Sequence, residues 1–203
     1  MIKTTDMLLE ELREYASPRS KLSRMAKNGE IFPIVKGLYE TDKGTPGIYL
    51  AGSIYGPSYV SFEYALGHYG LIPEAVYTLT CATFEKKKAK KYETPFGTFT
   101  YRDVPSEAFP LALKLVNEDG YYYRIATPEK ALCDMLYTLR PTANAAELHT
   151  MLNDDLRIED SELKKLDAAL VAELSEHYHT TNVKRLTGYL ERRLLYANYN
   201  ELN

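Results

Sequence analysis

The strongest chemical signal in this sequence is a group of basic side chains in residues 17–37, which read SPRSKLSRMAKNGEIFPIVKG. The stretch holds five basic residues against the single acid Glu30, and serines alternate with the basic residues. Arginine and serine can hydrogen-bond base edges and phosphates, and lysine neutralises phosphate charge. The composition favours a nucleic-acid contact, with an ordinary solvated helix face as the alternative.

A helix must position these side chains, and the sequence marks both of its ends. Ser17 and Pro18 form an N-cap and first-turn pair, and Asn28 and Gly29 are typical of a helix end. On that helix one face is apolar, with Leu22, Met25 and Ala26. The opposite face carries Ser20, Ser23, Arg24 and Lys27, with Arg19 at its edge.

The neighbouring segments predict the rest of a DNA-binding module. Residues 4–15 form an acidic amphipathic helix, capped by Thr5 or Asp6, and residues 31–40 form a hairpin that turns near Lys36. Helix, turn, helix and hairpin is the order of a short winged helix-turn-helix, in which the second helix reads DNA. The predicted DNA-binding residues are Arg19, Ser20, Lys21, Ser23, Arg24, Lys27 and Lys36.

A second basic cluster lies in residues 85–91, EKKKAKK, after a predicted strand. Lysine suits phosphate contact that does not depend on base sequence, or an acidic or RNA-bearing partner. A solvated hairpin loop or a protected sheet edge is the alternative. The residues concerned are Lys86, Lys87, Lys88, Lys90 and Lys91.

Signatures of catalysis are weak. The four histidines lack the spacing of a metal site, and no glycine-rich phosphate loop or nucleophile elbow is present. Glu85 and Lys87 could form half of a metal-dependent nuclease site if Glu63 or Asp103 lay near them. We expect a protein that is not an enzyme and needs neither a cofactor nor a metal.

Length and composition set the organisation. The chain has 203 residues, a net charge of −3 and two cysteines, which indicate a reduced, cytoplasmic setting. No signal peptide or membrane span is expected. The polar segment 41–46 (TDKGTP) is the predicted linker between a winged helix-turn-helix at 1–45 and a second domain at 46–203.

The second domain is predicted to be mixed α and β, and helical from about residue 143, so that the fold class is α+β. Helices are expected at 47–55, 61–69, 128–139, 144–152, 160–179 and 182–197. Strands are expected at 76–83, 94–104 and 121–126.

The order of these motifs resembles one family. RSKLSRMAKNGEI followed by VKGLYE (19–31 and 35–40) resembles the short winged-helix opening of AbiEi-type antitoxins. PSYVSFEYALGHYGLIPE (57–74) resembles the most recognisable signature of that family, and TPFGTFTY (94–101) and ATPEKALCD (126–134) continue it in order. The resemblance covers roughly residues 19–140, and the joint occurrence of the motifs is its specific feature.

The resemblance implies the antitoxin of a type IV toxin–antitoxin pair, linked to phage defence by abortive infection. Such an antitoxin binds inverted repeats in its promoter, represses its operon and counters a nucleotidyltransferase toxin without a lasting complex. The alternative is an antitoxin or adaptor with a vestigial winged helix that acts through protein or RNA. The signature residues are Tyr59, Ser61, Glu63, Gly70, Glu129 and Lys130, of which Ser61, like Thr127, is expected to cap a helix.

The sequence departs from a full winged helix in one respect. A single helix precedes the basic helix where two are usual, so we expect either that another segment, such as residues 47–55, supplies the third packing element or that the module has lost some DNA-binding capacity. A module of about 45 residues would be marginal alone, so we expect it to pack firmly on the second domain.

Overall fold

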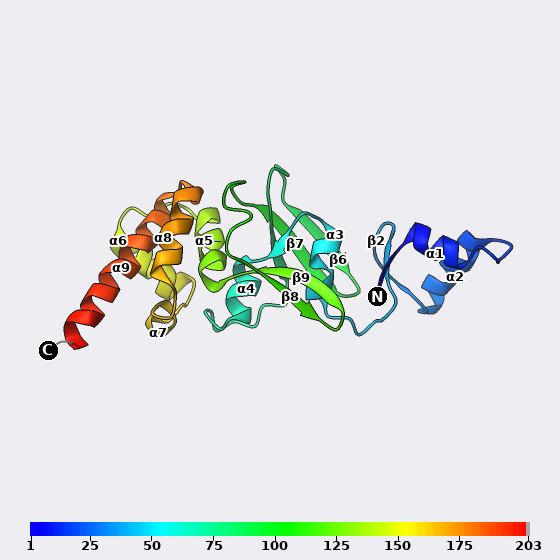
Figure 1. Ribbon diagram of the computed structural model, residues 1–203, viewed down its shortest axis with the longest axis horizontal. Helices are drawn as coiled ribbons and strands as arrows, with labels where there is room; N and C mark the ends of the chain where they lie inside the picture. The colour runs from blue at the N-terminus through cyan, green and yellow to red at the C-terminus, as the bar shows by residue number, and fades with distance from the viewer. Residues whose placement is uncertain (202–203) are drawn as a thin grey trace.

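The computed structural model describes residues 1–201, with side chains described to residue 192. Figure 1 shows three parts in line: a small N-terminal module at one end, a mixed sheet in the middle and a group of helices at the other end. The chain is thus mixed α and β with a helical C-terminal part, as the sequence predicts. Within the described residues, no helix is both long and apolar enough to cross a membrane.

The N-terminal module contains β1 (Ile2–Thr4), α1 (Thr5–Glu11), α2 (Pro18–Asn28), β2 (Phe32–Val35) and β3 (Leu38–Glu40). Its strands form an antiparallel sheet in the order β1-β3-β2. Strand β1 was not predicted, and the cap of α1 is Thr4 rather than Thr5 or Asp6: the Thr4 hydroxyl accepts from the Met7 amide at 3.2 Å. The predicted ends of α2 are confirmed: Pro18 begins the helix, and Gly29 follows it with φ of 72°.

The expectation that residues 47–55 supply the third packing element of this module is wrong. The module has its own small core of Leu8, Leu12, Leu22 and Ile31. Residues 47–55 form η1 (Gly47–Leu50) and α3 (Ala51–Ile54), and their buried side chains belong to the larger core of the second domain. The short strand β1 and the contact with the second domain complete the module instead.

The large sheet has the strand order β6-β7-β5-β4-β9-β8. Its strands are β4 (Tyr59–Val60), β5 (Leu79–Thr83), β6 (Lys90–Thr94), β7 (Gly97–Asp103), β8 (Leu113–Glu118) and β9 (Tyr121–Ala126). The β5–β7 and β4–β9 pairs are parallel, and the other pairs are antiparallel. Strand β8 was not predicted. It lies at an edge of the sheet, and its side chains are exposed or half-buried, so its sequence lacks the alternation of apolar and polar residues that marks a strand with one buried face.

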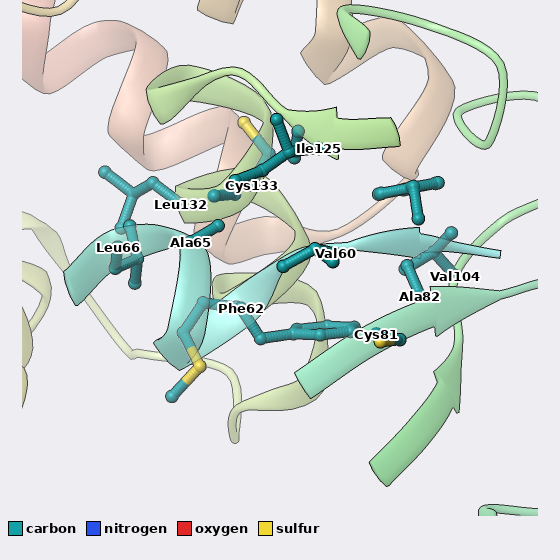
Figure 2. Packing of buried hydrophobic residues seen from close by; sticks show 14 of the residues in the cluster. Val60, Phe62, Ala65, Leu66, Cys81, Ala82, Val104, Ile125, Leu132 and Cys133 are labelled. Carbon is teal, nitrogen blue, oxygen red and sulfur yellow. The ribbon is translucent and has the colours of Figure 1, made fainter. Parts of the chain in front are cut away.

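Helices cover this sheet and form the C-terminal part. They are α4 (Phe62–His68), α5 (Pro128–Thr138), α6 (Ala145–Thr150), the π-helical turn η2 (Met151–Asp155), α7 (Asp160–Leu163), α8 (Ala168–Tyr178) and α9 (Thr181–Glu201). The predicted helix at 160–179 is two helices, because the chain leaves the helix after Leu163 and a new one begins behind the Asp167 cap. Figure 2 shows Val60, Cys81 and Ile125 of the sheet packed with Phe62, Leu132 and Cys133 of the helices.

The hairpin of the N-terminal module packs on the second domain. Ile34 is 5% exposed and belongs to the larger core, and the Phe32 ring meets the Phe96 ring edge-on at 6.4 Å between centroids. The buried Glu40 accepts a hydrogen bond from the Tyr121 hydroxyl at 3.0 Å. Apolar and polar contacts therefore fix the module to the sheet, and residues 41–46 join two parts that touch.

Candidate nucleic-acid interface

Helix α2 separates its apolar and basic side chains onto opposite faces. Leu22 is buried with Leu8 of α1 and with Leu12, which directly follows α1, and Met25 and Ala26 pack beside it. The residues of the opposite face are all exposed; they are Arg19, Ser20, Ser23, Arg24 and Lys27. Side chains at intervals of three and four share a helix face, so packing of the apolar stripe turns the basic stripe to solvent.

The exposed basic side chains of α2 are not neutralised by the protein. Within the described part of the chain, no carboxylate pairs with Arg19, Arg24 or Lys27. Lys21 is different: it is half-buried, with its ammonium 5.5 Å from the Tyr15 ring centroid and 3.9 Å from Glu30 Oε2. Of the predicted cations on α2, Lys21 therefore lies apart from the open face.

The predicted wing serves mainly as the contact with the second domain. Its turn places Lys36 at the exposed tip, and Gly37 there takes a φ of 85°. The Gly37 carbonyl accepts from the Thr5 amide at 3.0 Å, which holds the tip against the start of α1. Phe32 and Ile34 face the second domain, so that side of the hairpin is occupied, whereas Lys36 at the tip is exposed.

The lysine cluster of residues 85–91 leads into β6, the edge strand of the large sheet. Lys86 folds back, donating to the Gly56 carbonyl at 3.2 Å over the Tyr55 ring, and Lys91 pairs with Glu93 at 2.7 Å. Lys87, Lys88 and Lys90 are exposed. The cluster therefore protects a sheet edge, and it also presents cations on the strand that β2 of the N-terminal module contacts.

Four of the signature residues hold the interior of the second domain rather than a surface. Lys130 and Asp134, one turn apart on α5, are fully buried and join at 3.0 Å. Asp134 also accepts from the Tyr59 hydroxyl at 3.0 Å and from Ser61 at 2.6 Å. Glu129 accepts from the Asp167 amide at 3.0 Å and so ties α5 to the start of α8.

The Tyr178 hydroxyl completes this buried network. It accepts from Lys130 and donates to Asp134, so α8 is tied to α5 by the same ion pair. Burial, and then the negative charge of Asp134, raise the pKa of Tyr59 and of Tyr178 well above the ordinary value, so both hydroxyls stay protonated and can donate. Every charged group in the network thus has hydrogen-bonding partners, as a buried ion pair requires.

The other signature residues also have structural contacts. Glu63 forms an ion pair with Arg102, whose guanidinium lies 4.0 Å from the centroid of the Phe62 ring. Gly70 takes a φ of 73° where the chain turns after α4, a conformation that favours glycine. Ser61 stands at the start of α4, but the expectation that its side chain caps the helix is wrong, because its hydroxyl donates to Asp134 instead. Thr127 does cap α5, accepting from the Lys130 amide at 3.3 Å.

The residues of the nuclease alternative are used in local contacts. Asp103 accepts from the Thr83 hydroxyl and from the Lys87 amide, each at 2.6 Å. Glu85 accepts from Ser106 at 3.1 Å. Among the described residues, no group of three or more histidine, cysteine or carboxylate side chains is placed to hold a metal ion. This arrangement does not favour the nuclease.

Two members of the buried network, Asp134 and Tyr178, were not among the predicted site residues. Asp134 had one available signal, because Lys130 and Asp134 are four residues apart on a predicted helix. Tyr178 had no such signal, since only the packing of α8 on α5 brings it to the network.

In the comparisons with known proteins, no family model matches the chain and none of the curated proteins matches it.

Proposed function

We propose that this chain is a DNA-binding repressor and antitoxin, with α2 of a short winged helix-turn-helix as its reading helix. The observation that carries the proposal is the basic face of α2, which is exposed along its length while the opposite face is packed. The antitoxin role and its target, a nucleotidyltransferase toxin, rest on the resemblance of residues 19–140 to AbiEi-type antitoxins. No catalytic step by this chain is part of the proposal.

In the proposed complex α2 enters a major groove with its N-terminal half leading. Arg19 and Ser20 lie in its first turn, where the helix dipole adds partial positive charge, and Arg24 follows one turn later. Arginine there can bond guanine edges, and Lys27 and Lys36 neutralise phosphates. The exposed lysines 87, 88 and 90 extend the phosphate contact along the sheet edge.

A salt titration tests the DNA-binding half of the proposal. The probe is a labelled duplex from directly upstream of the gene, carrying its inverted repeats, and the readout is fluorescence anisotropy. Arg24→Ala with Lys27→Ala should weaken binding and lower the magnitude of the slope of log K against log salt by about 0.9, because Lys27 no longer neutralises a phosphate, whereas the lost Arg24 contact is to a base edge. Arg13→Ala is the matched control, because Arg13 is exposed in the turn after α1 and pairs with Glu10 at 2.7 Å.

An unchanged salt slope in the double variant would refute the role of α2. The alternative is an antitoxin or adaptor whose winged helix is vestigial and which acts through protein or RNA. The docking of the hairpin on the second domain favours it, because little of a wing remains free. That alternative predicts weak binding with equal affinity for scrambled DNA, and rescue of toxin-expressing cells by the double variant.

A further inference from the structure

A cleft lies at the joint between the N-terminal module and the second domain. Its volume is about 670 Å³, within the range of small-molecule sites. Strand β1, the linker, η1 and the β8–β9 hairpin all contribute to its wall. The lining includes Asp42, Thr45, Tyr49, Asp119, Tyr121 and Tyr122. Such a cleft between two packed parts is a usual place for a ligand.

The charge of the cleft is negative. Asp42 and Asp119 are exposed carboxylates of the lining, and the terminal ammonium of Met1, a cation at the same wall, is bound to Glu40. Glu118, exposed on the β8–β9 hairpin, accepts from the Tyr49 hydroxyl at 3.2 Å. The carboxylates of the lining are therefore left without a cation of their own in the described part of the chain.

Aromatic rings accompany these carboxylates. Tyr49 stacks on Tyr121 with 5.2 Å between centroids, which fixes the inner wall. Tyr122 is 67% exposed and offers a ring to solvent at the rim. The tight turn at Asp119 and Gly120, with φ of 51° and 80°, brings an acid and the tyrosines to the same end of the hairpin. Aromatic faces and carboxylates together attract organic cations.

We propose that this cleft binds a small organic cation with several ammonium groups, of the polyamine class. The ammonium groups would pair with Asp42 and Asp119, and the carbon chain would lie along the tyrosines. A metal ion fits the wall poorly, because among the described residues no set of three ligating side chains is gathered. A polyamine carries several ammonium groups along an apolar chain, and the lining of the cleft includes two aspartates together with tyrosines.

Calorimetry with spermidine on the full chain at low salt tests this proposal. We expect saturable binding at one site, and Asp42→Asn with Asp119→Asn should weaken it at least about tenfold, because two attractive charges are removed. Asparagine keeps the acceptor that each aspartate offers, at Asp42 to the Gly44 amide and at Asp119 to the Tyr49 hydroxyl. Glu176→Gln, an exposed carboxylate on α8, is the control and should bind as the unaltered chain does.

The exposed ring at the rim gives a second test that does not depend on the carboxylates. Tyr122→Ala should weaken spermidine binding by about two- to fivefold, the size of an exposed cation–π contact, while Tyr122→Phe should not. Absence of saturable binding, or equal affinity in the double asparagine variant, would overturn the proposal. Competition by an equal concentration of Mg²⁺ would overturn the assignment to an organic cation. DNA binding is measured separately, so its failure leaves this result unaffected.

Discussion

Replacement of Lys130 by methionine is the sharpest test of how the second domain is held together. Lys130 is fully buried and donates to Asp134 at 3.0 Å and to Tyr178. Methionine fills much of the same volume without a charge. The variant would leave the Asp134 carboxylate buried with three hydroxyl donors, from Tyr59, Ser61 and Tyr178, and with no cation.

The expected loss of stability follows from the burial of the pair. Removing one partner of a buried ion pair costs about 3 to 5 kcal/mol, because the remaining charge is uncompensated. Total unfolding free energies are about 5 to 15 kcal/mol, so this is a large share. For a chain of this length each kcal/mol lowers Tm by about 2 to 4 °C, so the drop should be about 6 to 20 °C.

The assay is thermal unfolding followed by far-ultraviolet circular dichroism. Lys164→Met is the matched control: Lys164 is exposed after α7, and its replacement should change Tm by less than about 2 °C. In Lys130→Met with Asp134→Asn neither charge of the pair remains, so this double variant should be more stable than Lys130→Met alone. A Tm within about 2 °C of the unaltered protein for Lys130→Met would refute the reasoning.

Further predictions concern packing and titration. Gly47→Ala should lower Tm, because its new methyl would lie 2.5 Å from a backbone carbonyl of the β6–β7 turn; Gly52→Ala, which meets open space, is the control. Burial and then Glu118 raise the pKa of Tyr123 to about 12, above the ordinary value of 10.0. The native state therefore holds this proton longer than the unfolded state, and stability should fall as pH rises from about 10 to 12; absorbance at alkaline pH follows the ionisation. Burial raises the pKa of Cys81 and Cys133, so a thiol reagent should label neither until denaturant is added, and rapid native labelling would contradict their placement.

The sequence predicted the basic helix well because the signals are local. The Ser17-Pro18 start, the Gly29 end and the apolar stripe through Leu22 each depend on residues within one or two turns. The same holds for Thr127 at the start of α5. Strand β1 and edge strand β8 were not predicted, because a short or half-exposed strand shows no clear alternation of apolar and polar residues in its sequence.

What the sequence by itself determined is which residue types share a helix face and where that helix begins and ends, since sterics and helical periodicity act over a few residues. Only the tertiary structure decided what those faces meet. In the folded protein, the hairpin of the N-terminal module packs against the second domain. Lys130 and Asp134 are buried together with Tyr59 and Tyr178, which lie 75 and 44 residues from Asp134 in the sequence. The spacing of Lys130 and Asp134 on one helix is local, but a buried ion pair also needs the hydroxyl donors that distant elements supply, so no local pattern could foretell its burial.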